Sequence, residues 1–386
     1  MKINYFILFY LLTWHVTAYS QATSNCSFLS VISKMNHQFS GNLNSFGNTI
    51  FYIDLFKDSV SVPGLGTIYT QDSTSLFVHE WDIASQSGRL IKLPIDGKVA
   101  FKGAIYRDSM KSYYTICAFR DTVTLGNKQF VSQGGTDILV FKVDSNNHVV
   151  WEKHYGSVEN DFPSSMNNVN QSDKIIFFMG FVKGIQIDTL TIPSDKKHTA
   201  IIEFNDNGTI LSVKSFKSLS STVDPIYLLV DKYGNIYCHL LFSLSYVMNM
   251  DLGGYILNVT PADYDNQLSF AYGVIKYDSS GTFQWVRHYS TNKHGTGAFG
   301  AYLLADSYGG VYVYGSFTAT YLSRLKIQGG GLFNANSTSD IFLFKFDKDG
   351  NFQWFRSTMA GSSQTDRSIC ISPQDEIYEA HTFGIH

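Results

Sequence analysis

The chain has 386 residues, of which 44% are hydrophobic, 15% aromatic and 16% charged. This composition can supply a sizeable core, and the many aromatic residues, 31 Gly and few charges suit strands joined by tight turns better than exposed helices. The formal net charge of -3 gives no electrostatic reason to expect nucleic acid as a partner, and no run of five or six like charges suggests an interaction tail.

Residues 1–22 are typical of a signal peptide, which would leave residues 23–386 as a single domain. Lys2 gives a positive start, and Tyr5–Leu12 is an apolar run too short to span a bilayer. Small residues that suit a cleavage site follow at Ala18, Ser20 and Ala22. The alternative is a membrane anchor, which the polar residues from Thr13 onward disfavour. No later segment reaches 18 apolar residues, so we expect a secreted or cell-surface protein without a membrane span after cleavage.

The four cysteines do not predict a disulfide framework or a metal site. They are Cys26, Cys117, Cys238 and Cys370. Export permits disulfides, but the last three lie far apart inside apolar strand patterns, so buried free thiols are the expected state. The chain has no C-x-x-C pair, which disfavours a zinc or redox site, and Thr-Ser-Asn before Cys26 makes that residue a poor lipid-attachment candidate.

A strand, a turn and a second strand recur along the chain. The pattern is sharpest in DIFLFKFDKDGNFQW, and its copies begin at Ser75, Asp137, Thr199, Phe270 and Asp340. A marker residue in each turn fixes the spacing. Gly88, Asn147, Gly208, Gly281 and Gly350 are 59, 61, 73 and 69 residues apart. The sequence therefore predicts repeats of about 65 residues.

Each repeat has a second recurring half, typified by DSYGGVYVYGSF. Its copies are Thr49–Phe56, Asp108–Phe119, Lys174–Phe181, Asp231–Phe242, Asp306–Phe317 and Glu376–Phe383. The segment that follows also recurs, since residues 56–62 (FKDSVSV) resemble residues 119–125 (FRDTVTL). Within Ala305–Gly315 this half predicts a second hairpin, so each repeat would contain about four short strands.

The alternation in one strand predicts burial on both of its faces. Phe342, Phe344 and Phe346 share one face, and Ile341 and Leu343 share the other. The D-x-[DNS]-G segment after this strand predicts a tight turn in which Gly supplies a positive φ. Four-stranded units that are buried on both faces predict an all-β protein of the β-propeller class. An open β-solenoid is the alternative, but its repeats are usually much shorter.

These motifs resemble the β-propeller repeats of secreted bacterial proteins, which are known as seven-bladed β-propeller repeats. The resemblance covers residues 46–386 and is strongest over 270–386, around Trp285 and Trp354. It is weaker at Trp151 and weakest at Asn205 and Asp82. The resemblance implies extracellular display or binding, usually without assigned chemistry. No functional residue carries over, because the family motif is a folding motif.

The phase of the repeats predicts about six blades. The first would start near His37 and the sixth near Ser368, and Ser27–Ser33 could supply an outer strand to the sixth. The equivalent of DIFLFKFD is then missing from that blade. Either the ring closes imperfectly or the sequence is a piece of a longer protein, and we favour the second. An unpaired apolar edge there would promote aggregation.

No histidine forms a convincing site in the sequence. His154 and His288 each follow a strand Trp by three residues, where the third copy has Ser357. All three lie on expected outer strands, so we interpret them as structural. His79-Glu80 lacks the second His of a zinc helix and lies in an expected strand.

The remaining motifs give equally weak evidence for a catalytic or metal site. Asp347-Lys-Asp349-Gly-Asn351 faintly resembles a calcium loop, but a tight turn explains it fully. There is no G-x-S-x-G motif and no Cys with a plausible His partner. A carboxylate pair for sugar chemistry is not visible from sequence spacing. The N-x-[ST] sequons carry little weight if the source is bacterial; they lie at Asn25, Asn170, Asn207, Asn258 and Asn336.

Two hypotheses about function follow. The first is an extracellular, non-catalytic binding or scaffold module whose partner is a protein or a glycan, with recognition in loops such as Gly329–Asp340 and Tyr246–Asn266. The second is an extracellular polysaccharide hydrolase or lyase with its site over the central channel. We expect a monomer without a cofactor, and the sequence identifies no catalytic, binding or metal residue.

Overall fold

The structure is a computed structural model. It describes residues 3–8, 42–46, 49–62, 64–82, 85, 87–107, 109–168, 174–193, 198–218, 223–243, 248–252, 255–259, 268–292, 298–318, 324–334, 339–359, 367–371 and 375–382. The chain divides into an N-terminal unit (Thr13–Lys196 and Ala200–Lys214) and a C-terminal unit (Met1–Leu12, Lys197–Thr199 and Ser215–His386). The described residues form strands and no helix, and so contain no helix that could cross a membrane. The prediction of an all-β protein is confirmed.

One long antiparallel sheet in the N-terminal unit follows the chain order. Its strands are β2 (Asn42–Phe46), β3 (Thr49–Val62), β4 (Gly66–Asp82), β5 (Ser87–Arg107), β6 (Tyr113–Leu125), β7 (Lys128–Val143) and β8 (Val149–Tyr155). The first half of β5 pairs with β4 and its second half with β6. The sheet is therefore two four-stranded meanders that share β5, in the phase that the repeats predict.

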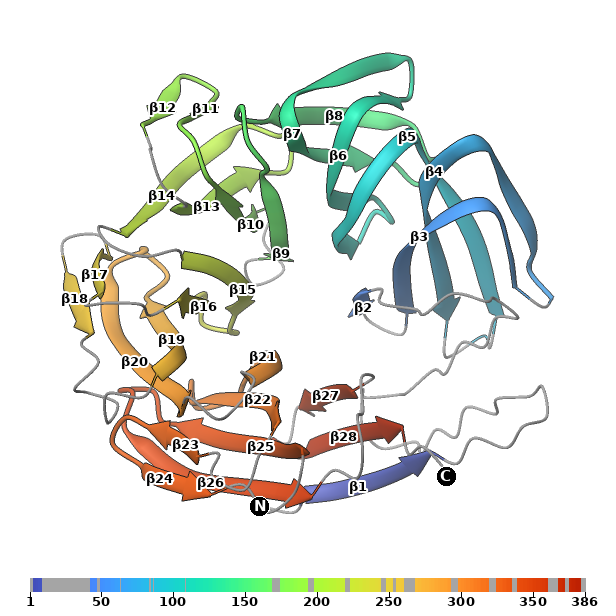
Figure 1. Cartoon of the computed structure of the whole chain (residues 1–386). Coiled ribbons are helices and arrows are strands. Elements are labelled where there is room, and N and C mark those ends of the chain that lie inside the picture. The colour runs from blue at the N-terminus through green and yellow to red at the C-terminus, as the bar shows by residue number, and fades with distance from the viewer. Residues whose placement is uncertain are drawn as a thin grey trace. The chain divides into compact units, whose positions relative to one another are not determined.

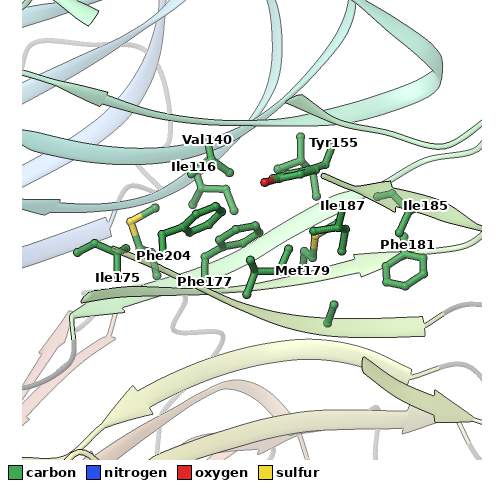
Figure 2. Close-up of a cluster of buried hydrophobic side chains, with 14 of the residues drawn as sticks. Ile116, Val140, Tyr155, Ile175, Phe177, Met179, Phe181, Ile185, Ile187 and Phe204 are labelled. Carbon is green, nitrogen blue, oxygen red and sulfur yellow. The ribbon is translucent and has the colours of Figure 1, made fainter. Parts of the chain in front are cut away.

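A second meander follows in the chain. It consists of β9 (Phe162–Asn168), β10 (Lys174–Phe181), β13 (His198–Asn205) and β14 (Ile210–Ser218). Its apolar side chains meet those of β6 and β7 in one cluster, where Phe177 stacks on Phe204 with ring centroids 5.4 Å apart. Figure 2 shows these side chains pointing toward one another from the two sheets. Two strand faces that are apolar throughout are thus buried against each other.

The C-terminal unit repeats this arrangement. One meander is β15 (Val223–Val230), β16 (Ile236–Ser243), β19 (Leu268–Tyr277) and β20 (Phe283–Asn292). The next is β21 (Ala298–Ala305), β22 (Val311–Thr318), β25 (Ser339–Phe346) and β26 (Phe352–Met359). A third sheet contains β27 (Arg367–Ile371), β28 (Ile377–Thr382) and β1 (Ile3–Leu8). β1 lies beside β28 (Figure 1) and pairs with it in parallel.

The two-faced burial predicted for β25 is confirmed. Phe342, Phe344 and Phe346 lie in a cluster with residues of β16, β19 and β20. Ile341 and Leu343 lie in a separate cluster with residues of β27 and β28. The sheet of β21, β22, β25 and β26 therefore has an apolar sheet against each of its faces.

The predicted turn chemistry is confirmed at four of the five marker residues, whereas Gly88 lies within β5, paired with Trp81, and has no positive φ. The turns between the third and fourth strands have a positive φ at Asn147, Gly208, Gly281 and Gly350. The turns between the first and second strands have one at Lys111, Gly234, Gly309 and Asp375. In both kinds of turn an Asp side chain accepts backbone N–H groups two and four residues further on, as Asp347 does from Asp349 and Asn351. Gly and Asn suit such positions because they tolerate the left-handed conformation.

A further hairpin, absent from the sequence-based expectations, lies between the second and third strands of each repeat. We call these the connection hairpins: residues 59–69, residues 122–131, β11 (Ile185–Ile187) with β12 (Leu190–Ile192), β17 (Met248–Asp251) with β18 (Ile256–Val259), and β23 (Arg324–Ile327) with β24 (Gly331–Asn334). Several pair with the fourth strand of the preceding repeat, as β23 does with β20 and β17 with β14. Much of Gly329–Asp340 and Tyr246–Asn266 is therefore hairpin and not loop.

A row of three side chains crosses the second, third and fourth strands in three of the repeats. We call it the Tyr-Lys-Trp row. Its members are Tyr114, Lys142 and Trp151; Tyr237, Lys276 and Trp285; and Tyr312, Lys345 and Trp354. The lysine ammonium lies 4.8, 5.2 and 4.8 Å from the centroid of the tyrosine ring. Such cation–π contacts allow a lysine to be buried between two aromatic rings.

Two of these rows bind the turn of the next repeat. The indole Nε1 of Trp151 donates to the carbonyl of Asp206 (2.9 Å), and that of Trp285 donates to the carbonyl of Lys348 (3.0 Å). A Cβ on Gly208 or Gly350 would lie 2.8 or 2.9 Å from the indole. The glycine of the repeat motif is thus needed both for its positive φ and for the close approach of the turn to the tryptophan.

Candidate functional site

The described residues bring one of the histidines considered above against a buried carboxylate. His154 lies on β8, at the edge of its sheet as expected, and Asp137 lies on β7. The ladder pairs His154 with Leu139, two residues from Asp137. His154 Nε2 lies 2.6 Å from Asp137 Oδ2. The His154 side chain is 21% exposed, whereas that of Asp137 has no exposed surface.

The carboxylate of Asp137 is held by its surroundings. Its Oδ2 also accepts the backbone N–H of Gln133 at 2.9 Å. A Cβ on Gly156 would lie 2.0 Å from Oδ2, so the chain approaches the carboxylate closely at a residue without a side chain. Oδ1 is buried and makes no hydrogen bond within the described part of the chain.

A second carboxylate lies in the segment that follows β8. Asp161 is fully buried. Its oxygens accept the backbone N–H of Ser157 at 2.6 Å and the Ser157 hydroxyl at 3.0 Å. Burial raises the pKa of Asp161 to about 7, the hydrogen bonds from Ser157 oppose this rise, and the charges of Asp137 and Glu159 add to it. A carboxyl group that titrates near neutrality is a feature of functional sites, although structural clusters have it as well.

Backbone hydrogen bonds clamp this segment to the start of β7. Asp161 N donates to the Thr136 carbonyl at 2.7 Å, and the Thr136 hydroxyl donates to the Asp161 carbonyl at 3.0 Å. Gly135 N donates to the Glu159 carbonyl, and Thr136 N donates to the Asn160 side chain. The two carboxyl groups and the imidazole therefore form one polar cluster that fixes the connection from β8 to β9.

The cluster has acid and base groups but lacks the geometry of a nucleophilic site. The Ser157 hydroxyl bonds to Asp161 and not to the imidazole. Neither Asp137 nor Asp161 has an exposed surface that a substrate could reach. The cluster therefore has a structural role at the connection from β8 to β9, and the structural interpretation of His154 gains a specific partner.

The other two histidine-motif positions lack this arrangement. His288 pairs with Gly273 on β19, so the residue that corresponds to Asp137 is Ala271. The backbone of His288 exchanges hydrogen bonds with Gln328 of a connection hairpin. Ser357 pairs with Phe342, which leaves the buried Asp340 at the position of Asp137. Sequence reasoning missed Asp137, Ser157 and Asp161. The sequence did contain one indication of Asp137, because an Asp begins both DILVFKVD (Asp137) and DIFLFKFD (Asp340).

The remaining predicted positions have structural surroundings. His79 and Glu80 lie on β4 as expected; burial lowers the pKa of His79, and Glu80 forms an ion pair with Arg89. Cys117 and Cys238 are buried free thiols, as predicted. Cys26, His37 and Ser27–Ser33 lie outside the described residues.

The acidic turn at Asp347 is a hydrogen-bonded turn, as its sequence predicts. Besides the two backbone N–H groups, the carboxylate accepts the side-chain amides of Asn351 and Gln353 at 3.1 and 3.0 Å. Asp278 is bonded in the same way by the Gln284 amide. The described residues contain no group of three or more His, Cys, Asp or Glu side chains that could hold a metal ion.

No family model matches the chain, and a search of the curated proteins finds no match. The resemblance to the β-propeller repeats of secreted bacterial proteins therefore depends on the repeat residues alone.

Proposed function

We propose that the chain is a β-propeller of about six blades that acts outside the cell as a non-catalytic binding or scaffold module. The four-stranded meanders and their burial on both faces support the propeller. The hydrogen bonds from Trp151 and Trp285 to the turns of the next repeats give further support, because they join successive sheets in the same way. The proposed location rests on the signal-like residues 1–22.

One observation carries the binding role. The connection hairpins each expose a large apolar side chain, in the part of the chain that is described. These are Tyr69 (67% exposed), Val131 (63%), Leu190 (46%), Tyr255 (46%) and Leu332 (45%). Single exposed apolar residues are ordinary on a protein surface. Their recurrence at one topological position, on hairpins that are fixed to the sheets, favours a recognition surface.

Tyr255 is the member of this set for which a ring contact is described. Its ring stacks on Phe283 at a centroid distance of 4.7 Å and an interplanar angle of 13°. A rigid aromatic ring that is half exposed suits contact with a sugar face or with an apolar side chain of a protein. We therefore place the proposed recognition on the connection hairpins and not in the His154 cluster, where both carboxyl groups are buried.

A glycan array combined with an activity screen on a polysaccharide panel tests the proposal. We expect binding without turnover, and weaker binding by the Tyr69→Ala and Tyr255→Ala variants. Tyr308→Ala is the matched control, because Tyr308 is 78% exposed but lies in a turn between first and second strands. Polysaccharide cleavage would favour the enzyme hypothesis. Binding that is lost equally in the Tyr308 variant would remove the connection hairpins from the proposal.

A further inference from the structure

The turn between β13 and β14 joins two repeats. The Trp151 indole donates to the Asp206 carbonyl at 2.9 Å, and the Asp206 carboxylate accepts the Tyr114 hydroxyl and the Lys142 ammonium. A Cβ on Gly208 would lie 2.8 Å from the indole. The contact between the two repeats therefore depends on the backbone of this turn and on a residue without a side chain at position 208.

The residue before the glycine position differs among the four equivalent turns. The pairs are Asn146 with Asn147, Asn207 with Gly208, Ser280 with Gly281, and Asp349 with Gly350. The second pair is the one Asn-Gly sequence in the whole chain. Since glycine has no side chain to shield its amide nitrogen, this nitrogen can reach the side-chain carbonyl carbon of a preceding asparagine. Of the four turns, this one thus has the pair that is most reactive toward ring closure.

The side chain of Asn207 is oriented toward the residues that follow it. Its Oδ1 accepts the Thr209 hydroxyl at 2.9 Å and the Thr209 backbone N–H at 3.4 Å. Both Asn207 and Thr209 are exposed. The two donors stabilise the negative charge that develops on Oδ1 when a nucleophile adds to the carbonyl carbon. The turn therefore presents a polarised amide that water and hydroxide can reach.

One hydrogen bond opposes this reaction in the folded chain. Gly208 N donates to the Asn205 carbonyl at 3.1 Å, so the bond must open before the nitrogen can lose its proton. The bond lies in a turn whose neighbouring residues Asn207 and Thr209 are exposed, and such turns open locally far more often than the whole chain unfolds. The fold therefore slows the reaction without preventing it.

We propose that Asn207 is a site of spontaneous deamidation, with water as the co-reactant. Solvent hydroxide removes the amide proton of Gly208, and the nitrogen forms a bond to Cγ of Asn207. The Cγ–Nδ2 bond then breaks, ammonia leaves with a proton from water, and a succinimide ring remains. Water opens this ring at either of its carbonyl groups, so the products are aspartate and isoaspartate at position 207.

The two products differ in their effect on the turn. Aspartate keeps the backbone unchanged, and Asp349 occupies this position in the equivalent turn between β25 and β26. Isoaspartate instead places an additional methylene in the main chain between residues 207 and 208. Gly208 then shifts relative to the Trp151 indole, on which it packs closely, and to the Asp206 carbonyl that accepts the indole N–H. Formation of isoaspartate therefore weakens the contact between the two repeats.

Incubation of the full chain for several days, followed by peptide mass spectrometry, tests the proposal. Asn146 is the matched control, because it is exposed at the same turn position but precedes Asn147, whose side chain hinders the attacking nitrogen. We expect Asn207 to convert faster than Asn146, faster at pH 8 than at pH 6, and faster in urea than in buffer. The Thr209→Val variant should convert about fivefold more slowly, the equivalent of one hydrogen bond to Oδ1.

Thermal melting measures the effect on the turn. The unchanged chain should melt at a lower temperature after incubation, whereas Asn207→Ser, which has the residue of Ser280 and cannot form the ring, should not. Fresh Asn207→Asp separates the effect of the added charge from that of isoaspartate, and circular dichroism verifies that each variant is folded. Conversion of Asn207 that is no faster than that of Asn146 would overturn the proposed site. An incubated chain that contains isoaspartate at position 207 and melts like the fresh chain would overturn the effect on the turn.

Discussion

The indole Nε1 of Trp285 donates a hydrogen bond to the backbone carbonyl of Lys348, 3.0 Å away and 63 residues further along the chain. This bond connects the fourth strand of one repeat to the turn of the next. Trp151 makes the corresponding bond to Asp206 in the N-terminal unit. Trp354 lies against Tyr312 as Trp285 lies against Tyr237, but within the described residues its indole donates to no carbonyl. A comparison of the two tryptophans therefore measures the contribution of the hydrogen bond to stability.

Replacing Trp285 with Phe should therefore cost more stability than replacing Trp354 with Phe. Trp285→Phe loses the hydrogen bond, leaves the Lys348 carbonyl less satisfied and opens a small cavity, for a total of about 2–3 kcal/mol. Trp354→Phe should cost about 1 kcal/mol or less. Urea denaturation followed by circular dichroism measures both. Equal losses would mean that ring packing, and not the bond to the turn, holds the repeats together.

Gly350→Ala should destabilise the chain by about 2–4 kcal/mol. Alanine at φ 81° is strained, and its Cβ would lie 2.9 Å from the Trp285 indole. Lys111 is the counterpart, since it has a φ of 65° and is exposed. Lys111→Gly should relieve strain and leave stability unchanged or up to about 1 kcal/mol higher. Thermal melting of both variants gives the comparison, and a neutral Gly350→Ala would contradict the close packing of the turn on the indole.

The stability of the chain should fall as the pH rises from about 4 to about 7. The pKa of Asp161 is about 7 in the folded state against an ordinary value of 3.8, so the folded chain binds this proton more tightly than the unfolded chain. The stabilisation is fully present below the ordinary value and is lost as the pH passes the folded value. It amounts to at most about 4 kcal/mol if the whole shift is realised.

The Asp161→Asn variant isolates this contribution, because asparagine keeps an oxygen acceptor for Ser157 but does not ionise. Unfolding free energies at a series of pH values should show a flatter profile for the variant between pH 4 and 7. Two profiles of the same slope would show that the Asp161 carboxyl does not titrate within the fold. The His154→Gln variant removes the imidazole beside Asp137, so its unfolding free energies show separately what this group contributes to stability.

Cys117 should be inert toward thiol reagents in the folded protein. Burial raises the pKa of its thiol to about 12, so almost no thiolate forms near neutral pH. Iodoacetamide treatment at pH 8 followed by peptide mass spectrometry should find Cys117 unlabelled in the native chain and labelled in urea. Rapid native labelling would indicate that the sheet opens at β6.

The sequence predicts the local structure well because that structure depends on short patterns. The alternation of Phe342 and Phe344 with Ile341 and Leu343 predicted two buried faces, and clusters on both sides of β25 confirm them. The Gly at position 350 predicted a positive φ, which the turn has. Both inferences need only the strand period and the conformational freedom of one residue.

The contacts of the candidate site were not predictable in this way. His154 was interpreted as structural, but its partner Asp137 lies 17 residues earlier and is brought near by the register of β7 and β8. The burial that raises the pKa of Asp161 depends on how residues 156–161 return to β7. Likewise, Gly329–Asp340 was expected to be a loop, because its hairpin depends on another repeat: β24 pairs with β23, and β23 pairs with β20 of the preceding repeat.

β1 belongs to the segment that the sequence predicts to be removed on export. If cleavage follows Ala22, the strand beside β28 leaves with the leader, and the ladder of Ile377–Thr382 loses its neighbour on that side. An unpaired strand edge readily pairs with another chain. The strand composition of this sheet would then differ between the unprocessed chain and the processed one, although no residue of β27 or β28 changes.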